Sequence, residues 1–136
     1  MSLYLLDTNM VSFTLSGRSP AARARLANLA PQDTVSISAV TEGELLFGLA
    51  KSPSQLRRQA LEQFLGAFIV HPWGREAAAA YGGLRFRQER LGKKLGPYDT
   101  QIAAHAMALG AILVSHDTAF RRIPNLQVEN WATDIP

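Results

Sequence analysis

The 136-residue sequence contains no cysteine, which excludes disulfide bonds and metal sites built on thiolates. It also lacks any apolar run near the roughly 18 residues that a membrane-spanning helix needs. The first residues show neither the basic region nor the long apolar stretch of a secretory signal. These absences lead us to expect a cytoplasmic protein.

Charge is scarce as well, because charged residues make up only 18% of the chain and the net charge is +3. An excess this small gives little indication of a nucleic-acid partner by itself. The basic residues are unevenly placed, however, and the segment 85–94 opposes them with a single acid, Glu89. A basic patch of this kind favours contact with an anionic polymer. Its members are Arg85, Arg87, Arg90, Lys93 and Lys94.

The composition, with 47% hydrophobic residues and no low-complexity tract, is that of a globular protein. A chain of this length can build one core but is too short for two domains of ordinary size. We therefore expect a single domain over residues 1–136.

Short apolar runs alternate along the chain with segments whose apolar residues recur every three or four positions. This alternation predicts an α/β fold with a mostly parallel sheet and helices on both faces. The predicted strands are 3–6, 35–38, 68–70, 111–114 and an edge strand at 127–131. The predicted helices are 20–29, one opening at 41, one from 54, 75–91 and 99–109.

Four acidic residues occupy positions where a parallel sheet places its ligand site. Asp7 and Asp117 follow two predicted strands, while Glu44 and Asp99 lie in the first turns of predicted helices. In open α/β sheets, ligands bind beyond the carboxyl ends of the strands. We therefore expect the four carboxylates to face the same rim of the sheet.

Three of the four acids also have a purely structural interpretation. Asp99 suits a helix N-cap, Asp117 suits a cap for the short turn after it, and Glu44 matches a capping box with Thr41. For Asp7 no such role is evident, because no helix is predicted to follow it. The residues alone leave both interpretations open for the other three.

Taken together, the four acids are easier to explain as a metal site. Two carboxylates about 4 Å apart repel by roughly 4 kcal/mol at an effective dielectric near 20, unless protons or a cation neutralise them. Hard divalent ions prefer oxygen ligands, and magnesium commonly takes one or two carboxylates together with waters and phosphate oxygens. The pattern therefore favours Mg²⁺ or Mn²⁺ over zinc, and the attack of a metal-activated water on a phosphodiester.

The histidines and tryptophans have simpler interpretations. His71, His105 and His116 are expected to be packed or solvated rather than to bind a metal. Trp73 and Trp131 are expected to be buried, although indole rings can also stack on bases.

Three ordered blocks of sequence resemble the VapC toxins, which are the PIN-domain ribonucleases of bacterial toxin–antitoxin pairs. The blocks are LLDTN at 5–9, TEGELLFG at 41–48 and GPYDTQIAAHA at 96–106, and the resemblance extends to the ending at 123–131. A single four-residue block would be weak, whereas three blocks in order in a chain of this length are specific. The resemblance implies a PIN-like three-layer sandwich with a central, mostly parallel sheet.

The resemblance also implies which residues carry the chemistry. Asp7, Glu44 and Asp99 match the family's acidic site, which binds Mg²⁺ or Mn²⁺ and catalyses RNA cleavage. Asp117 stands where the fourth acid usually lies, in a segment that varies within the family. Polar residues that would support the site by orienting waters or carboxylates are Thr8, Asn9 and Ser115.

Partners follow from the resemblance in the same way. The blocks around Asp99 and Trp131 are similar to the VapC branch that cuts initiator tRNA in its anticodon loop. The family implies a homodimer and a cognate VapB antitoxin, which often inserts an arginine into the acidic pocket. An RNA substrate would give the basic segment at 85–94 a role in phosphate contact.

Other functions share parts of this pattern. A metal-dependent phosphatase with Asp7 as nucleophile needs a second acid two residues later, where Asn9 stands. A phosphoacceptor receiver domain needs a lysine where Ser115 and His116 stand, and a dinucleotide-binding module needs a glycine-rich turn after the first strand. A catalytically inactive PIN-fold module that binds RNA stays open, although the presence of all four acids argues against it.

Overall fold

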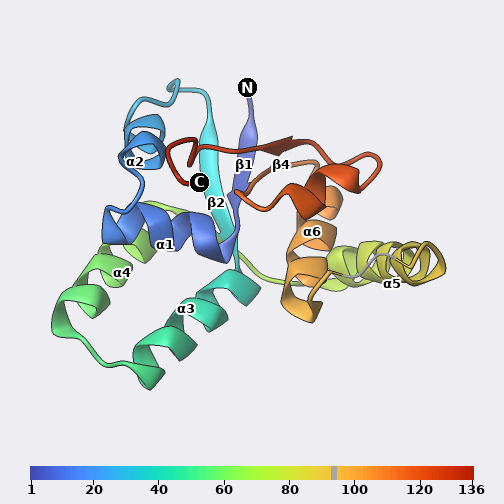
Figure 1. Ribbon diagram of the computed structural model, residues 1–136, viewed down its shortest axis with the longest axis horizontal. Helices are drawn as coiled ribbons and strands as arrows, with labels where there is room; N and C mark the ends of the chain where they lie inside the picture. Colours follow the sequence, from blue (N-terminus) through green and yellow to red (C-terminus); the bar gives the residue numbers. More distant parts are fainter. Residues whose placement is uncertain (93–94) are drawn as a thin grey trace.

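A five-stranded parallel sheet forms the centre of the computed structural model, which describes residues 1–92 and 95–136 (Figure 1). The strand order is β3-β2-β1-β4-β5, so the first strand of the chain is central. All neighbouring strands pair in parallel, and their carboxyl ends therefore lie at one edge of the sheet. The strands are β1 (Leu3–Leu6), β2 (Thr34–Ser38), β3 (Ile69–His71), β4 (Ile112–Val114) and β5 (Val128–Glu129).

Helices cover both faces of this sheet, as the alternation in the sequence predicts (Figure 1). Their bounds are α1 (Thr8–Ser16), α2 (Pro20–Ala27), α3 (Ala39–Lys51), α4 (Gln55–Ala67), α5 (Arg75–Arg90), α6 (Pro97–Leu109) and a short 3₁₀-helix, η1 (Thr118–Arg122). α1, α2 and α4 pack on one face, and α5, α6 and η1 pack on the other. The predicted three-layer α/β arrangement is confirmed. None of the described helices is both long enough and apolar enough to cross a membrane.

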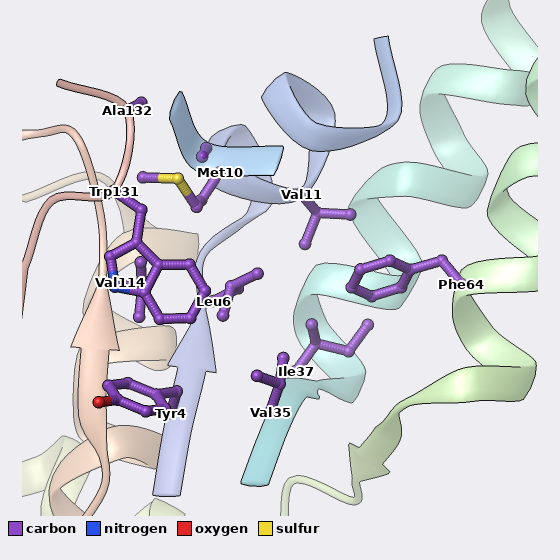
Figure 2. Packing of buried hydrophobic residues seen from close by; sticks show 11 residues of the cluster. Tyr4, Leu6, Met10, Val11, Val35, Ile37, Phe64, Val114, Trp131 and Ala132 are labelled. Atoms are coloured by element: carbon purple, nitrogen blue, oxygen red, sulfur yellow. The ribbon is translucent and has the colours of Figure 1, made fainter. Parts of the chain in front are cut away.

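Side chains alternate between the two faces along β1 and thereby divide the core into two clusters. Tyr4 and Leu6 point to the face covered by α1, α2 and α4. Figure 2 shows them packed with Met10 of α1, Phe64 of α4 and Trp131 from the C-terminal segment. This cluster holds the start of α1 directly beyond the end of β1.

On the opposite face, Leu5 of β1 and Leu113 of β4 pack under α5 and α6. Leu84 of α5 and Ile102 of α6 are fully buried in this second cluster. The packing fixes α6 so that its first turn, which carries Asp99, lies toward the carboxyl edge of the sheet.

The register of the central strands brings three polar residues to the same level. Leu6 of β1 pairs with Ile37 of β2 on one side and with Val114 of β4 on the other. The residues that follow these three along the chain are Asp7, Ser38 and Ser115.

α1 was not predicted from the sequence. Its residues Thr8, Val11 and Thr14 are β-branched, and such residues have modest helix propensity. The helix forms because Met10 and Val11 are completely buried against the sheet, and because tertiary packing supplies most of the stability of a short helix.

Two predicted helix starts are shifted toward the N-terminus. α3 begins at Ala39 rather than Thr41, because the Ser38 hydroxyl accepts a hydrogen bond from the Val40 amide at 3.1 Å and caps the helix. α6 begins at Pro97, with Gly96 as its N-cap. Each shift changes the position of one acidic residue within its helix, Glu44 in α3 and Asp99 in α6.

Candidate active site

Asp7 directly follows β1 and is almost completely buried, with 4% of its surface exposed. Its Oδ1 accepts a hydrogen bond from the Met10 amide at 2.9 Å and so caps α1. The expectation that Asp7 has no helix to cap is therefore wrong, because α1 was overlooked. Capping explains the position of Asp7 but not its charge, since a neutral asparagine caps a helix equally well.

The pKa values of Asp7 and Asp99 show that these two carboxyl groups feel other acidic residues nearby. Burial raises the pKa of Asp7 from 3.8 to about 6, and the charges of Asp99 and Asp117 add to the rise. Burial also raises the pKa of Asp99, with further contributions from Glu44 and then Asp117. Carboxylates from four separate segments of the chain therefore lie close enough to repel each other at the carboxyl edge of the sheet.

Asp99 lies in the first turn of α6 but does not cap it. Gly96 is the N-cap, and Asp99 is the third residue of the helix after Pro97. The interpretation of Asp99 as an N-cap is therefore wrong. Its partly buried carboxylate still lies near the positive end of the helix dipole, where a negative charge is favoured.

Glu44 lies in the second turn of α3, because that helix begins at Ala39. The predicted capping box with Thr41 does not form, and that interpretation is also wrong. Instead, Glu44 Oε1 accepts a hydrogen bond from the Thr8 hydroxyl at 2.6 Å, and this hydroxyl lies 3.3 Å from that of Thr41. Thr8 thus holds the Glu44 carboxylate at the start of α1, beside Asp7.

Asp117 is exposed and caps η1, because its Oδ1 accepts a hydrogen bond from the Ala119 amide at 2.9 Å. Its own amide donates to the hydroxyl of Ser115 at 3.0 Å. The structural role that the sequence offered for Asp117 is therefore present. Its charge nevertheless raises the pKa of Asp7 and Asp99, so it lies at the margin of the acidic cluster.

Two of the three polar residues predicted to support the acids contact them. Thr8 donates to Glu44, and the side chain of the buried Ser115 lies close enough to Asp7 to lower the pKa of its carboxyl group. Asn9 is exposed, and among the residues that the structure describes no hydrogen bond joins it to an acid. Its supporting role stays a prediction.

No described basic side chain neutralises the cluster. In the described parts of the chain, the ion pairs within 4 Å are Arg25–Glu129 and Arg85–Glu89, and neither includes one of the four acids. Uncompensated carboxylates at one edge are unfavourable unless a cation or protons neutralise them.

The carboxylates do not form a closed cage. Within residues 1–92 and 95–136, no three histidine, aspartate or glutamate side chains converge closely enough to enclose a metal ion. The donors available are carboxylate and hydroxyl oxygens. Such a set fits a hard ion like Mg²⁺, which binds one or two carboxylates and completes its shell with water and phosphate oxygens.

The basic segment lies on the second half of α5, where Arg85, Arg87 and Arg90 are exposed. Arg85 Nε donates to Glu89 at 3.2 Å, and its Nη1 donates to the hydroxyl of Tyr81 at 3.2 Å. None of the three arginines forms an ion pair with the acidic cluster among the described residues. The other two members, Lys93 and Lys94, lie outside the described residues.

A buried polar contact between the N-cap of α3 and α6 was missed by sequence reasoning. Ser38 Oγ and His105 Nδ1 lie 2.8 Å apart, and both residues are almost fully buried. Ser38 caps α3, which carries Glu44, while His105 lies on α6, which carries Asp99. The signal was present in the sequence, because His105 interrupts the otherwise apolar run from residue 102 to 106.

Known proteins are similar in sequence to this chain over nearly its whole length. The family model for the PIN domain matches residues 4–126. A relative from Rickettsia felis, named Ribonuclease VapC2, is 34% identical over 131 residues, which cover 95% of this chain and 98% of the relative. The tRNA(fMet)-specific endonuclease VapC of Shigella flexneri is 36% identical over 134 residues, covering 97% and 100%.

Solved structures share the fold as well. VapBC2 from Rickettsia felis, bound to a DNA fragment from its promoter, contains a chain that matches with a TM-score of 0.89 and 33% identity, covering 95% of this chain and 98% of that one. DNA-bound VapBC from Salmonella typhimurium matches with a TM-score of 0.83 and 32% identity, covering 96% and 99%. The chain therefore belongs to the PIN-domain family, and within that family it is a VapC-type ribonuclease.

Proposed function

We propose that the protein is the toxin of a VapBC-type toxin–antitoxin pair and that it cuts RNA internally in the presence of Mg²⁺ or Mn²⁺. One observation carries the proposal: four mutually repelling carboxylates lie at the carboxyl edge of the sheet without a described basic partner. A cation together with a phosphate chain relieves such repulsion. We propose that residues 1–136 form a single domain that carries this activity.

In this proposal one or two of the carboxylates of Asp7, Glu44 and Asp99 would bind the metal directly and the others would act through bound water, while Asp117 adds negative charge from the margin. A bound divalent ion would lower the pKa of a coordinated water and stabilise the leaving oxygen of a phosphodiester. Asp7 is mostly ionised at neutral pH, because its raised pKa of about 6 still lies below 7. The hydrogen bond that Thr8 donates restricts the orientation of the Glu44 carboxylate, as outer-shell partners of metal ligands commonly do.

The proposed substrate is initiator tRNA, cut in its anticodon loop. Two relatives whose names specify tRNA(fMet), from Shigella flexneri and Salmonella typhimurium, are 36% and 35% identical to this chain over nearly its full length. An RNA loop exposes unstacked nucleotides that can enter a site at the rim of a sheet. The exposed arginines of α5, Arg85, Arg87 and Arg90, would add phosphate contacts.

The proposed partner is a VapB-type antitoxin, since the solved relatives from Rickettsia felis and Salmonella typhimurium are VapBC complexes. A groove of about 420 Å³ lies between α1, α3 and α4 and is lined by Leu15, Leu45, Leu49 and Leu61 among others. Such a groove suits an apolar helical segment of a partner. Leu45 directly follows Glu44, so a partner in the groove could place an arginine against the acids. A homodimer and a cytoplasmic location, where tRNA is found, complete the proposal.

Incubation of the purified protein with total tRNA tests the proposed activity. We expect specific cutting with Mg²⁺ or Mn²⁺ and no cutting with EDTA, and mapping of the RNA ends should place the cut in initiator tRNA. Asp7→Asn should remove the activity while the protein stays folded. Unchanged cutting by this variant would refute the assigned site.

Other outcomes separate the alternatives. Cutting of a different RNA would reject only the proposed substrate. RNA binding without cutting in any metal would support the inactive PIN-fold module, and release of phosphate from a phosphomonoester would support the phosphatase.

A further inference from the structure

A second hollow lies between α5 and α6, beside the first turn of α6. Its volume is about 300 Å³, at the lower end of the roughly 300–1,000 Å³ typical of small-ligand pockets. Thr100, which lines it, directly follows Asp99 in α6. Successive residues of a helix point about 100° apart, so the pocket adjoins the acidic cluster without sharing its side chains.

Gln88 of α5 lines this pocket and is an unusual residue to bury. The inward stripe of α5 runs through Ala77, Tyr81 and Leu84, and Gln88 continues it. Gln88 is only 7% exposed, whereas Leu91, at the next position of the stripe, is 62% exposed. A glutamine therefore occupies the inward position near the end of the helix, where an apolar residue is expected.

The amide of Gln88 makes no hydrogen bond with any residue in the described ranges 1–92 and 95–136. Among the described residues the buried side-chain polar atom without a partner is His71 Nε2, so the Gln88 amide atoms remain accessible from the pocket. The position of this amide on the pocket wall means that a molecule in the pocket could supply the missing hydrogen bonds.

The other polar groups of the pocket are already paired. Arg85 bonds to Glu89 and to the Tyr81 hydroxyl, each at 3.2 Å. The Thr100 hydroxyl donates to the Gly96 carbonyl oxygen at 2.9 Å. The Gln88 amide is therefore the polar group left to recognise a ligand.

The remaining walls are apolar and one of them is aromatic. They come from the ring of Tyr81 and from the side chains of Leu95 and Pro97. The pocket thus combines apolar walls with one amide that carries both a donor and an acceptor. A flat ring with a donor and an acceptor on one edge fits this combination.

We propose that the pocket binds a nucleobase of the RNA close to the cleaved phosphodiester and that Gln88 reads the edge of that base. This inference rests on the ribonuclease function proposed above. Unstacked RNA bases are recognised by stacking on aromatic side chains and by hydrogen bonds to their edges. A glutamine amide pairs through both of its groups with adenine, so adenine is the base expected at this position.

The test combines a protein variant with modified RNA. Gln88→Met keeps the length of the side chain but removes the amide, and Gln59→Met makes the same change at an exposed glutamine of α4. The substrates are an RNA hairpin containing the cut site and a series in which one nucleotide near the cut is abasic. The measured quantity is kcat/KM for each pair of protein and RNA.

We expect one abasic position to lower kcat/KM of the wild-type protein by roughly 5- to 100-fold. Gln88→Met should show a similar loss with intact RNA and no further loss at that abasic position. Gln59→Met should behave as the wild type does. This pattern would show that the amide and the base act together.

An equal penalty for the wild type and Gln88→Met at every abasic position would overturn the inference but leave the ribonuclease function intact. Absence of cutting by any protein would instead reject the proposed function. Urea unfolding checks that Gln88→Met is folded. Gln88→Glu, which keeps the shape but loses the donor, provides a second variant and should reduce the preference for adenine at the identified position.

Discussion

Ser38 Oγ lies 2.8 Å from His105 Nδ1 and joins the two helices that carry Glu44 and Asp99. The Ser38 hydroxyl oxygen already accepts a hydrogen bond from the Val40 amide, so its hydrogen is available to a neutral His105 ring. Burial, and then the neighbouring His71, lower the pKa of His105. A neutral ring, whose Nδ1 can accept this hydrogen, is therefore the form favoured by the fold.

The Ser38–His105 contact should make stability depend on pH. Because the folded-state pKa of His105 lies below the usual 6.5, the unfolded chain takes up the proton first as the pH falls. The stability that the neutral ring contributes is complete above pH 6.5 and is lost as the pH falls through the folded-state pKa. We expect the difference in unfolding free energy between the wild type and His105→Gln, measured in urea, to shrink from pH 7.5 to pH 5. A difference that stays constant over this range would contradict the prediction.

Asp7→Asn should stabilise the metal-free protein at neutral pH. The raised pKa of Asp7 means that the folded state binds more protons than the unfolded state between pH 3.8 and about 6. Stability is therefore lost as the pH rises through this window, and asparagine avoids the loss while keeping the cap on α1. We expect the free energy of unfolding in EDTA at pH 7.5 to rise by up to about 3 kcal/mol, as measured in urea.

Asp134→Asn is a matched control for that change. Hydrogen bonds from the Ser19 hydroxyl and the Ala21 amide lower the pKa of Asp134. The charged form is therefore the stabilising one, and removal of the charge should lower the unfolding midpoint. If both variants shifted the midpoint in the same direction, repulsion within the acidic cluster would not explain the effect at Asp7.

Thr8→Val should weaken metal binding with little effect on the fold. The substitution keeps the β-branched shape but removes the hydroxyl that donates to Glu44 at 2.6 Å. Loss of such an outer-shell partner typically lowers metal affinity or activity by about 10- to 100-fold. The half-saturating Mn²⁺ concentration for RNA cleavage is expected to rise by this factor, and Thr8→Ser should restore it. Thr133→Val, at an exposed position, should have no effect.

Substitutions at Asp117 should separate its cap from its charge. Asparagine caps a helix as well as aspartate does, so Asp117→Asn should keep the unfolding midpoint of the wild type. Asp117→Ala removes the bond to the Ala119 amide and should cost about 0.5–2 kcal/mol. We expect Asp117→Asn to retain part of the RNA-cleaving activity, because this residue lies at the margin of the cluster. Complete inactivation would instead make Asp117 a direct ligand.

Metal binding should itself depend on pH. A divalent ion competes with the proton for Asp7, whose pKa is about 6. Millimolar Mn²⁺ is therefore expected to raise the melting temperature at pH 7.5 but to have little effect at pH 5. The shift should also disappear in Asp7→Asn at either pH, and a full shift in that variant would place the ion elsewhere.

The elements with the strongest local patterns were the ones that could be predicted. β1 and α5 follow from an apolar run and from a helical periodicity, and both form where expected. α1 was missed because its β-branched residues indicate a helix only weakly, and because the burial of Met10 and Val11 cannot be read from neighbouring residues. The two shifted helix starts have a related cause, since several nearby residues can cap a helix and packing selects among them.

The sequence by itself determined the alternation of strands and helices apart from α1, the four acids and the family, because these depend on local patterns and on motifs that remain visible in a linear chain. Only the tertiary structure decided which acids cap helices, which hydroxyl holds Glu44 and why a glutamine is buried between α5 and α6. Thr8 and Glu44 are 36 residues apart, and Ser38 and His105 are 67 apart. Such contacts arise from the packing of distant segments, and no local pattern specifies them.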